Sequence, residues 1–328
     1  MMTNLAPPQI RATTGLELAA GIFAKCSDGL ASQLNISLTS GKRDRGPAEF
    51  RIGINGDIYG GMQAPIEVGT RSVDIAYVNP SAMVAMAYLG KGYYKEKMRL
   101  RVLGCFPSWD RIALIVSKDL GVKSLHDIAR RRIPLNVSTR FSGVNNATYY
   151  TISTILSLYG YSFDEIKRWG GEVQECPRPD APERRKGIAR RSLTAVFDEG
   201  ISTVGGWLDQ ALVNGYEIIP IEPEIIKKLE AMGYRRATLP KKRYRPLKED
   251  ALTIDFSGWA LVTHKWLANR VAYAAIETVD EKKKSIPVDD DKPLNMRELC
   301  NGSEKCPLRV PLHPGAAKYY KEKGYLKK

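Results

Sequence analysis

Strand-like and helix-like segments alternate along almost the whole of this chain, and that alternation restricts its fold more than any other feature. Short apolar runs such as Val73–Val78 and Ile133–Val137 predict buried strands. Segments with apolar residues at helical spacing follow them, for example Ser81–Leu89 and Val144–Leu158. This order is typical of α/β proteins, so we expect mostly parallel sheets flanked by helices.

The length of the chain indicates two domains, because 328 residues are many for one hydrophobic core. Two stretches, 106–112 and 251–260, flank long apolar strands and are expected to carry the chain between the domains. The second stretch runs into a predicted continuous strand, Ile254–Thr263. We therefore predict one lobe from residues 1–110 with 257–328, and another from 111–256.

Two helix starts are marked by local signals. Ser124, followed by Leu125–Ile128, predicts a capped short helix. Near the C-terminus, Pro311–Gly324 predicts a Pro/Gly turn that opens a short helix with its own stop signal. His126 and His313 are accordingly expected in a surface helix and a surface turn, in structural roles.

The charge balance favours an anionic partner. The chain has 50 Lys and Arg against 36 Asp and Glu, a formal net charge of +14. A polyanion is one interpretation, and a small anionic ligand or an anionic neighbouring surface is the other. The basic residues are spread over several loops, including 170–191 and 235–250, which we expect to be solvent-exposed. Because no nucleic-acid-binding motif accompanies them, no nucleic acid is expected as a partner.

Cysteine and histidine usage argues against a disulfide framework and a metal site. The five cysteines are odd in number and scattered, and the spacing of Cys300 and Cys306 fits either a small bridged loop or two free thiols. Only three histidines occur, and no spacing resembles that of zinc ligands. We expect no metal and no cofactor.

Four segments, in this order, resemble those of the TAXI group of solute receptors, which serve tripartite (TRAP) transporters. The resemblance covers most of the chain, and the last segment is the most specific. The loops expected to face a ligand differ: Thr13–Leu18 lacks the family's tyrosine pair, and Phe197–Gly200 carries two acids in place of glycine. The four segments are Gly69–Ala76, Ile112–Ile128, Tyr159–Ile166 and Pro311–Gly324.

The resemblance implies a type 2 periplasmic binding-protein fold, with two lobes, a ligand cleft between them and hinge closure on the ligand. It also implies membrane transporter subunits as partners if the protein is exported. The chain begins Met1-Met2 without the charged and apolar regions of a signal peptide. We therefore expect a periplasmic protein if a leader was trimmed, and a cytoplasmic one otherwise.

Ligands of open α/β sheets bind beyond the carboxyl ends of the strands, so the loops there supply the candidate site. The stretch Ser138–Gly143 precedes a predicted helix, whose backbone N–H groups and dipole favour an anion, and Arg140 adds a bidentate carboxylate contact. The alternative is a helix cap with an exposed arginine. The predicted ligand-binding residues are Thr13, Thr14, Asn55, Asn79, Ser81, Trp109, Ser138, Arg140, Phe141, Ser142 and Glu199.

Three functions fit these residues. The first is a solute-binding protein that closes on a small organic anion, a carboxylate and with Trp109 an aromatic one. The second is a cytosolic enzyme on the same scaffold, such as an aromatic-acid decarboxylase or lyase, with Asp198, Glu199 or Asp110 as the acid or base. The third is a cytosolic ligand sensor. The sequence leaves the oligomeric state open.

Overall fold

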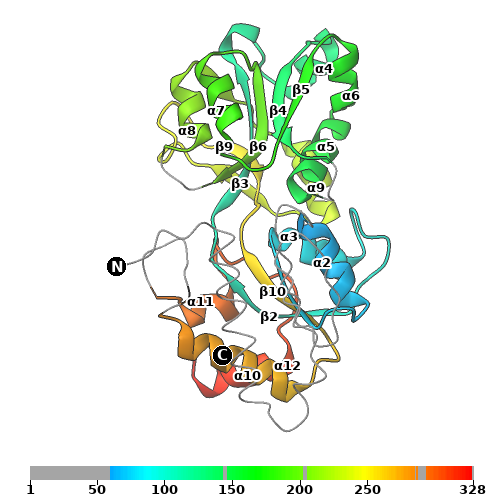
Figure 1. The fold of residues 1–328 in the computed structure, drawn as a ribbon, viewed down its shortest axis with the longest axis vertical. Coiled ribbons are helices and arrows are strands. Elements are labelled where there is room, and N and C mark those ends of the chain that lie inside the picture. Colours follow the sequence, from blue (N-terminus) through cyan, green and yellow to red (C-terminus); the bar gives the residue numbers. More distant parts are fainter. Residues whose placement is uncertain (1–59, 143–145, 202–204, 285, 287–292, 327–328) are drawn as a thin grey trace. The chain divides into compact units, whose positions relative to one another are not determined.

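A computed structural model describes residues 60–142, 146–201, 205–284, 286 and 293–326. Within these ranges the backbone contacts separate two compact units. Unit 1 takes in the described residues up to Trp109 and from Ser257 onward, and unit 2 is Asp110–Phe256. Each unit has its own sheet and its own helices (Figure 1). The α/β class expected from the alternation is confirmed.

Unit 1 contains a sheet of three described strands in the order β1-β10-β2. Helices α2 and α3 contact β1 and β10, while α10, α11 and α12 contact β2. In Figure 1, α10 and α12 are drawn below β2. The bounds are α2 Gly60–Gly69, β1 Ile75–Val78, α3 Ser81–Leu89, β2 Leu100–Phe106, β10 Trp259–His264, α10 Asn269–Lys282, α11 Met296–Asn301 and α12 Pro314–Glu322.

Unit 2 contains a five-stranded sheet, β5-β4-β6-β3-β7, and a two-stranded sheet, β8-β9. Its strands are β3 Asp110–Ser117, β4 Asn136–Arg140, β5 Glu172–Cys176, β6 Ala195–Ile201, β7 Tyr216–Ile218, β8 Arg236–Leu239 and β9 Ala251–Ile254. Its helices are α4 Leu125–Arg131, α5 Ala147–Leu158, α6 Phe163–Arg168, α7 Pro182–Ala189, α8 Trp207–Val213 and α9 Pro223–Met232, with a 3-10 turn at Lys118–Leu120.

The strand directions differ from the mostly parallel sheets expected. In unit 1 the described pairings, β1 with β10 and β10 with β2, are antiparallel. In unit 2 only β4 runs parallel to its neighbours β5 and β6, while β3 is antiparallel to β6 and β7. Alternation predicts parallel pairing only for strands joined by a helical crossover. β10 instead enters its sheet from a distant part of the chain and separates β1 from β2.

The predicted continuous strand over 254–263 is wrong, because it breaks into β9 and β10. Gly258 lies between them with φ +84°, and a Cβ at this position would be 2.7 Å from both Cys105 Sγ and Pro307 Cδ. Only glycine fits this left-handed and crowded turn. The break brings the 257–258 backbone next to the start of α3, where Ser81 N donates to Gly258 O at 3.1 Å.

The C-terminal segment completes the core of unit 1. Helix α12 begins at Pro314, with His313 as its N-cap. Tyr320 is fully buried and donates to Leu103 O in β2 at 3.1 Å. His313 itself is buried, so its predicted place in a surface turn is wrong: the turn packs against β2, where His313 N donates to Val102 O at 2.8 Å.

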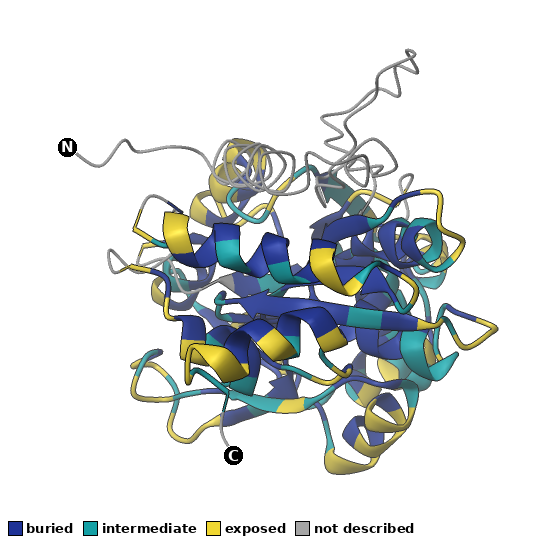
Figure 2. Cartoon of the chain, turned by 90° about the horizontal axis from the view of Figure 1, so that it is seen from below, coloured by how far each residue is buried: buried dark blue, intermediate teal, exposed yellow. Residues whose placement is uncertain are grey.

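Burial follows the layers. The strands are dark blue along most of their length in Figure 2, whereas the helices are dark blue on one side and yellow on the other. All eight residues of β3 are buried, which indicates that both faces of the unit 2 sheet are covered. In Figure 1, α7 and α8 are drawn to one side of this sheet and α4 and α6 to the other.

Candidate functional site

The predicted site residues fall into three groups. Thr13, Thr14 and Asn55 lie outside the described residues. Asn79, Ser81 and Trp109 belong to unit 1, and the others belong to unit 2.

The unit 1 residues contact the protein's own chain. Ser81 Oγ donates to Ser257 O at 2.9 Å, and Asn79 Nδ2 donates to Gly258 O at 3.2 Å. Both bonds attach the start of α3 to the turn before β10. Trp109 Nε1 donates to Glu304 Oε1 at 3.2 Å. These contacts give the three residues a place in the local fold, and their role in ligand binding stays a prediction.

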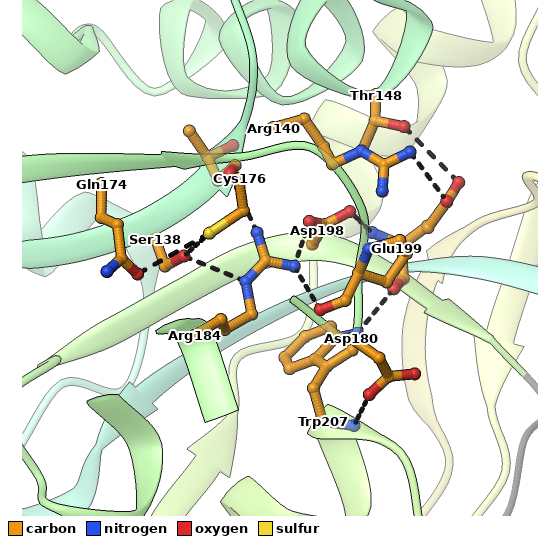
Figure 3. A network of polar contacts seen from close by, with 12 residues as sticks. Ser138, Arg140, Thr148, Gln174, Cys176, Asp180, Arg184, Asp198, Glu199 and Trp207 are labelled. Atoms are coloured by element: carbon orange, nitrogen blue, oxygen red, sulfur yellow. Dashed lines mark hydrogen bonds and ion pairs between the residues drawn. The ribbon is translucent and has the colours of Figure 1, made fainter. Parts of the chain in front are cut away.

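In unit 2 an ion pair between Arg184 and Asp198 lies beneath the carboxyl ends of β4 and β6 (Figure 3). Both side chains are fully buried, and Arg184 Nη1 donates to Asp198 Oδ2. The guanidinium also donates to Thr139 O at 2.9 Å and to Pro179 O at 2.8 Å. A carboxylate so enclosed and paired is poorly suited to acid–base chemistry on a ligand.

Ser138 belongs to this buried network rather than to a ligand-facing surface. Its Oγ accepts a hydrogen bond from Arg184 Nε at 3.0 Å and lies 3.4 Å from Cys176 Sγ. Burial raises the pKa of the Cys176 thiol above its usual value, although Ser138 and Arg184 act in the opposite direction. This thiol therefore stays protonated at neutral pH.

The sequence interpretation missed Arg184, since its run of basic residues was expected to be solvent-exposed. Helix α7 buries Arg184 together with Gly187 and Ile188, at positions i, i+3 and i+4 of one face. That spacing was the available signal. Trp207 packs against the network: its ring centroid is 5.7 Å from Arg184 Cζ, and its Nε1 donates to Glu199 O at 3.0 Å.

Above the buried pair, Arg140, Glu199 and Thr148 come together at the edge of the sheet (Figure 3). Arg140 is the last residue of β4, Glu199 lies in β6, and Thr148 is in the first turn of α5. Arg140 Nη2 is 3.5 Å from Glu199 Oε1, and Thr148 Oγ1 is 3.5 Å from Glu199 Oε2. Both contacts are long for charge-assisted hydrogen bonds, which are typically about 2.7–2.9 Å.

Arg140 is not the exposed arginine of the alternative interpretation, since only 6% of its surface is accessible. The helix start is less open than predicted. Helix α5 begins at Ala147 with Asn146 as its N-cap, and Asn146 Oδ1 accepts from the N–H groups of Thr148 and Tyr149, at 2.9 and 3.0 Å. Because the cap occupies these donors, an anion at this edge depends on Arg140 more than on the helix amides.

The remaining predicted residues surround this edge. Phe141, next to Arg140, is 41% exposed, and Ser142 N donates to Glu175 Oε2 at 2.9 Å. Asp110 is the buried first residue of β3, and its carbonyl accepts from Phe256 N at 2.9 Å. Its partner in the β3–β6 register is Ile201, the last residue of β6.

Neither a metal centre nor a membrane span is found in the part of the chain that the structure describes. No three His, Cys, Asp or Glu side chains gather there as a metal site would require. Among the same residues, no helix combines the length and apolar character needed to cross a bilayer.

Two units, each built on its own sheet with flanking helices, define a two-domain α/β protein with a polar cluster at one sheet edge. The chain belongs to the NMT1-like family, whose pattern it matches over residues 57–324.

Solved structures with similarity to this chain include a periplasmic binding protein and other proteins that bind small molecules. The aliphatic sulphonate binding protein SsuA from Escherichia coli matches with a TM-score of 0.33 and 11% identity, over 70% of this chain and 63% of that one. PhnD1 from Prochlorococcus marinus in complex with methylphosphonate gives 0.31 and 13%, over 70% and 71%. ProX, a glycine/betaine/L-proline-binding protein from Borrelia burgdorferi, gives 0.39 and 12%, over 87% and 93%. With TM-scores this low, nothing about the ligand follows from these matches.

Proposed function

We propose that this protein is a solute-binding protein that holds a small organic anion at the carboxyl ends of β4 and β6. The observation that carries the proposal is the nearly buried guanidinium of Arg140 at the end of β4, whose Nη2 lies 3.5 Å from Glu199 Oε1. A buried guanidinium favours an anionic partner, because burial removes the water that would otherwise solvate its charge. A ligand carboxylate in place of Glu199 makes two short parallel hydrogen bonds to the guanidinium.

We propose a carboxylate with an aromatic ring as the ligand class. Phe141 directly follows Arg140 and exposes 41% of its surface, so it offers an apolar face at the same strand end. The net charge of +14 attracts anions of any kind and raises their encounter rate. The planar fork of an arginine favours carboxylate geometry among them.

A thermal-shift screen of organic acids, aromatic and aliphatic, tests the proposal on the full chain. A binder stabilises the folded state by mass action, by about 2.7 kcal/mol when its concentration is a hundred times Kd. The stabilisation is expected to disappear in Arg140→Ala and to persist in Arg130→Ala, which removes an exposed arginine of the same unit.

Glu199→Gln provides a second test of the proposal if Arg140→Ala does not fold. It removes the charge that competes for Arg140 while keeping the shape of the side chain, so the ligand is expected to bind more tightly. Isothermal titration calorimetry with the best acid of the screen measures this change. A library in which no acid stabilises the protein, or an acid that binds equally well to Arg140→Ala, contradicts the proposal.

Three further expectations from the sequence stay predictions. They are membership of the TAXI group, cooperation with TRAP-transporter subunits, and a periplasmic location. Cell fractionation tests the location, and co-purification with membrane subunits tests the partnership. Closure of the two units on a ligand also stays a prediction, and small-angle scattering tests it through a smaller radius of gyration on adding the acid.

A further inference from the structure

Trp266 lies on the surface of unit 1 in the middle of three cations. The side chain follows the end of β10 and is 48% exposed. Lys265 Nζ is 5.2 Å from the ring centroid, and the guanidinium carbons of Arg71 and Arg99 are 5.9 and 6.0 Å from it. We call these four residues the Trp266 patch.

The Trp266 patch is built by the fold rather than by one flexible segment. Its cations come from three separate places: the turn before β1, the residue before β2 and the end of β10. Lys265 N donates to Arg99 O at 2.9 Å, which joins two of these places. The Trp266 ring packs 6.1 Å from His264, whose Nε2 lies 2.7 Å from Asp74 Oδ1. The position of the Trp266 ring is therefore fixed by contacts within the folded unit.

The patch keeps its positive charge. Arg71 and Arg99 are exposed, and Lys265 is half-buried. Within the described residues, none of the three cations forms an ion pair with a carboxylate, and Asp74 is paired with His264. Three like charges around one exposed aromatic ring repel one another, so an anionic partner relieves an unfavourable arrangement.

We propose that the Trp266 patch binds an anionic lipid surface. Tryptophan is enriched where membranes meet water, because its ring is amphipathic, and neighbouring Lys and Arg attract anionic headgroups. The net charge of +14 adds long-range attraction to such a surface. An acidic protein segment also suits the cations, but it gives no reason for a large aromatic ring left half-exposed among them.

Vesicle co-sedimentation of the full chain tests the proposal, with phosphatidylcholine vesicles against equimolar phosphatidylcholine and phosphatidylglycerol. Binding is expected only to the anionic vesicles and is expected to weaken with salt. Each basic residue near the surface contributes about 1 kcal/mol, so the triple variant R71A/R99A/K265A is expected to lower the partition coefficient on the order of 100-fold.

The matched control is K241A/K242A/K248A, which removes three exposed charges from unit 2. It is expected to change the partition coefficient much less than the patch variant. Equal losses in the two triple variants mean that diffuse charge accounts for the binding, and that outcome overturns the proposal, as does no binding to anionic vesicles.

A second readout reports the ring itself. Lipids brominated on the acyl chain quench tryptophans that reach the membrane interface. Quenching is expected to be lost in Trp266→Phe and retained in Trp169→Phe, a substitution in unit 2. Unchanged quenching in Trp266→Phe overturns the proposal. Equally strong binding to polyglutamate, independent of Trp266, overturns it too and indicates an acidic protein segment instead.

Discussion

Arg184 and Asp198 form a fully buried ion pair that ties α7 to β6. Arg184 also donates to Ser138 Oγ at 3.0 Å and to backbone carbonyls, while Asp198 Oδ1 accepts from Glu199 N at 2.7 Å. The pair therefore fixes the ends of β4 and β6, from which Arg140 and Glu199 project. Its role is to position the candidate site from below.

Removing one partner of this pair is expected to destabilise the protein strongly. Asp198→Asn leaves Arg184 as an uncompensated buried charge, at a cost of about 3–5 kcal/mol in the free energy of unfolding. The double variant R184M/D198L buries no charge and is expected to lose less than Asp198→Asn. Denaturant unfolding measures both. Lys167→Ala, which breaks an exposed pair with Asp164, serves as the control and is expected to cost about 0–1 kcal/mol.

Gly315 is expected to tolerate no larger side chain. A Cβ at this position would be 2.1 Å from Asn269 O, a backbone atom at the start of α10. Gly315→Ala therefore forces α10 and α12 apart and is expected to cost about 1–3 kcal/mol or more, as overpacking does. The neighbouring exposed substitution Lys321→Ala is expected to be close to neutral. Similar melting temperatures for the two variants contradict this packing.

Local signals predicted those elements whose start and stop are marked by residues within the element or directly beside it. Helix α3 has the predicted bounds Ser81–Leu89, and Ser124 and Asp127 form the capping box expected at α4. The break at Gly258 depends instead on contacts with Cys105 and Pro307, and the buried ion pair of Arg184 depends on Asp198, residues that lie elsewhere in the sequence. Local patterns contain no record of such contacts.

The candidate site was predictable to a similar extent. The sequence located Arg140 and Glu199 at strand ends, because the ends of apolar runs are visible in the chain. It did not distinguish Ser138, which points into the buried network, from Arg140 two residues later. Ser138 and Arg140 are two residues apart in β4, so their side chains point to the same face of the sheet. Ser138 lies against α7 and Arg140 lies near the first turn of α5, a difference that only the packed structure determines.

Asp280 is expected to make the stability of unit 1 pH-dependent. Burial raises the pKa of this carboxyl, but hydrogen bonds from Lys283, Tyr319 and Tyr325 outweigh it, so the pKa lies below its usual value. A lowered folded-state pKa means that the stabilisation is present above the unfolded-state pKa of about 3.9 and is lost as the pH falls below it. The carboxylate accepts from Tyr319 Oη at 2.7 Å and from Lys283 Nζ at 2.8 Å.

Thermal unfolding across the acidic range measures this effect. Asp280→Asn is expected to melt below the native protein at neutral pH, and the difference is expected to shrink as the pH falls through about 4. Asp164→Asn removes an exposed carboxyl and is expected to change little at any pH. A constant gap between Asp280→Asn and the native protein down to the lowest pH shows that the carboxylate charge is not the cause.

The cysteines are expected to react slowly in the native protein. Cys105, Cys176, Cys300 and Cys306 are free and buried, so of the two alternatives for Cys300 and Cys306 the structure has the free thiols. Burial raises the pKa of Cys300 to about 11, which leaves little of the nucleophilic thiolate at neutral pH. In a Cys26→Ser background, Ellman's reagent is expected to label these four thiols slowly in the native protein and rapidly after unfolding.

Oxidation is expected to join Cys105 to Cys306 rather than Cys300 to Cys306. The interaction of the Cys306 thiol with that of Cys105, together with burial, raises the pKa of Cys306. A disulfide requires two sulfurs already close together, and the thiol that acts on Cys306 is that of Cys105, not that of Cys300. Treatment with oxidised glutathione followed by proteolysis and mass spectrometry identifies the linked peptides. A Cys300–Cys306 product as the main species contradicts the pairing, and Cys105→Ser is expected to abolish the predicted one.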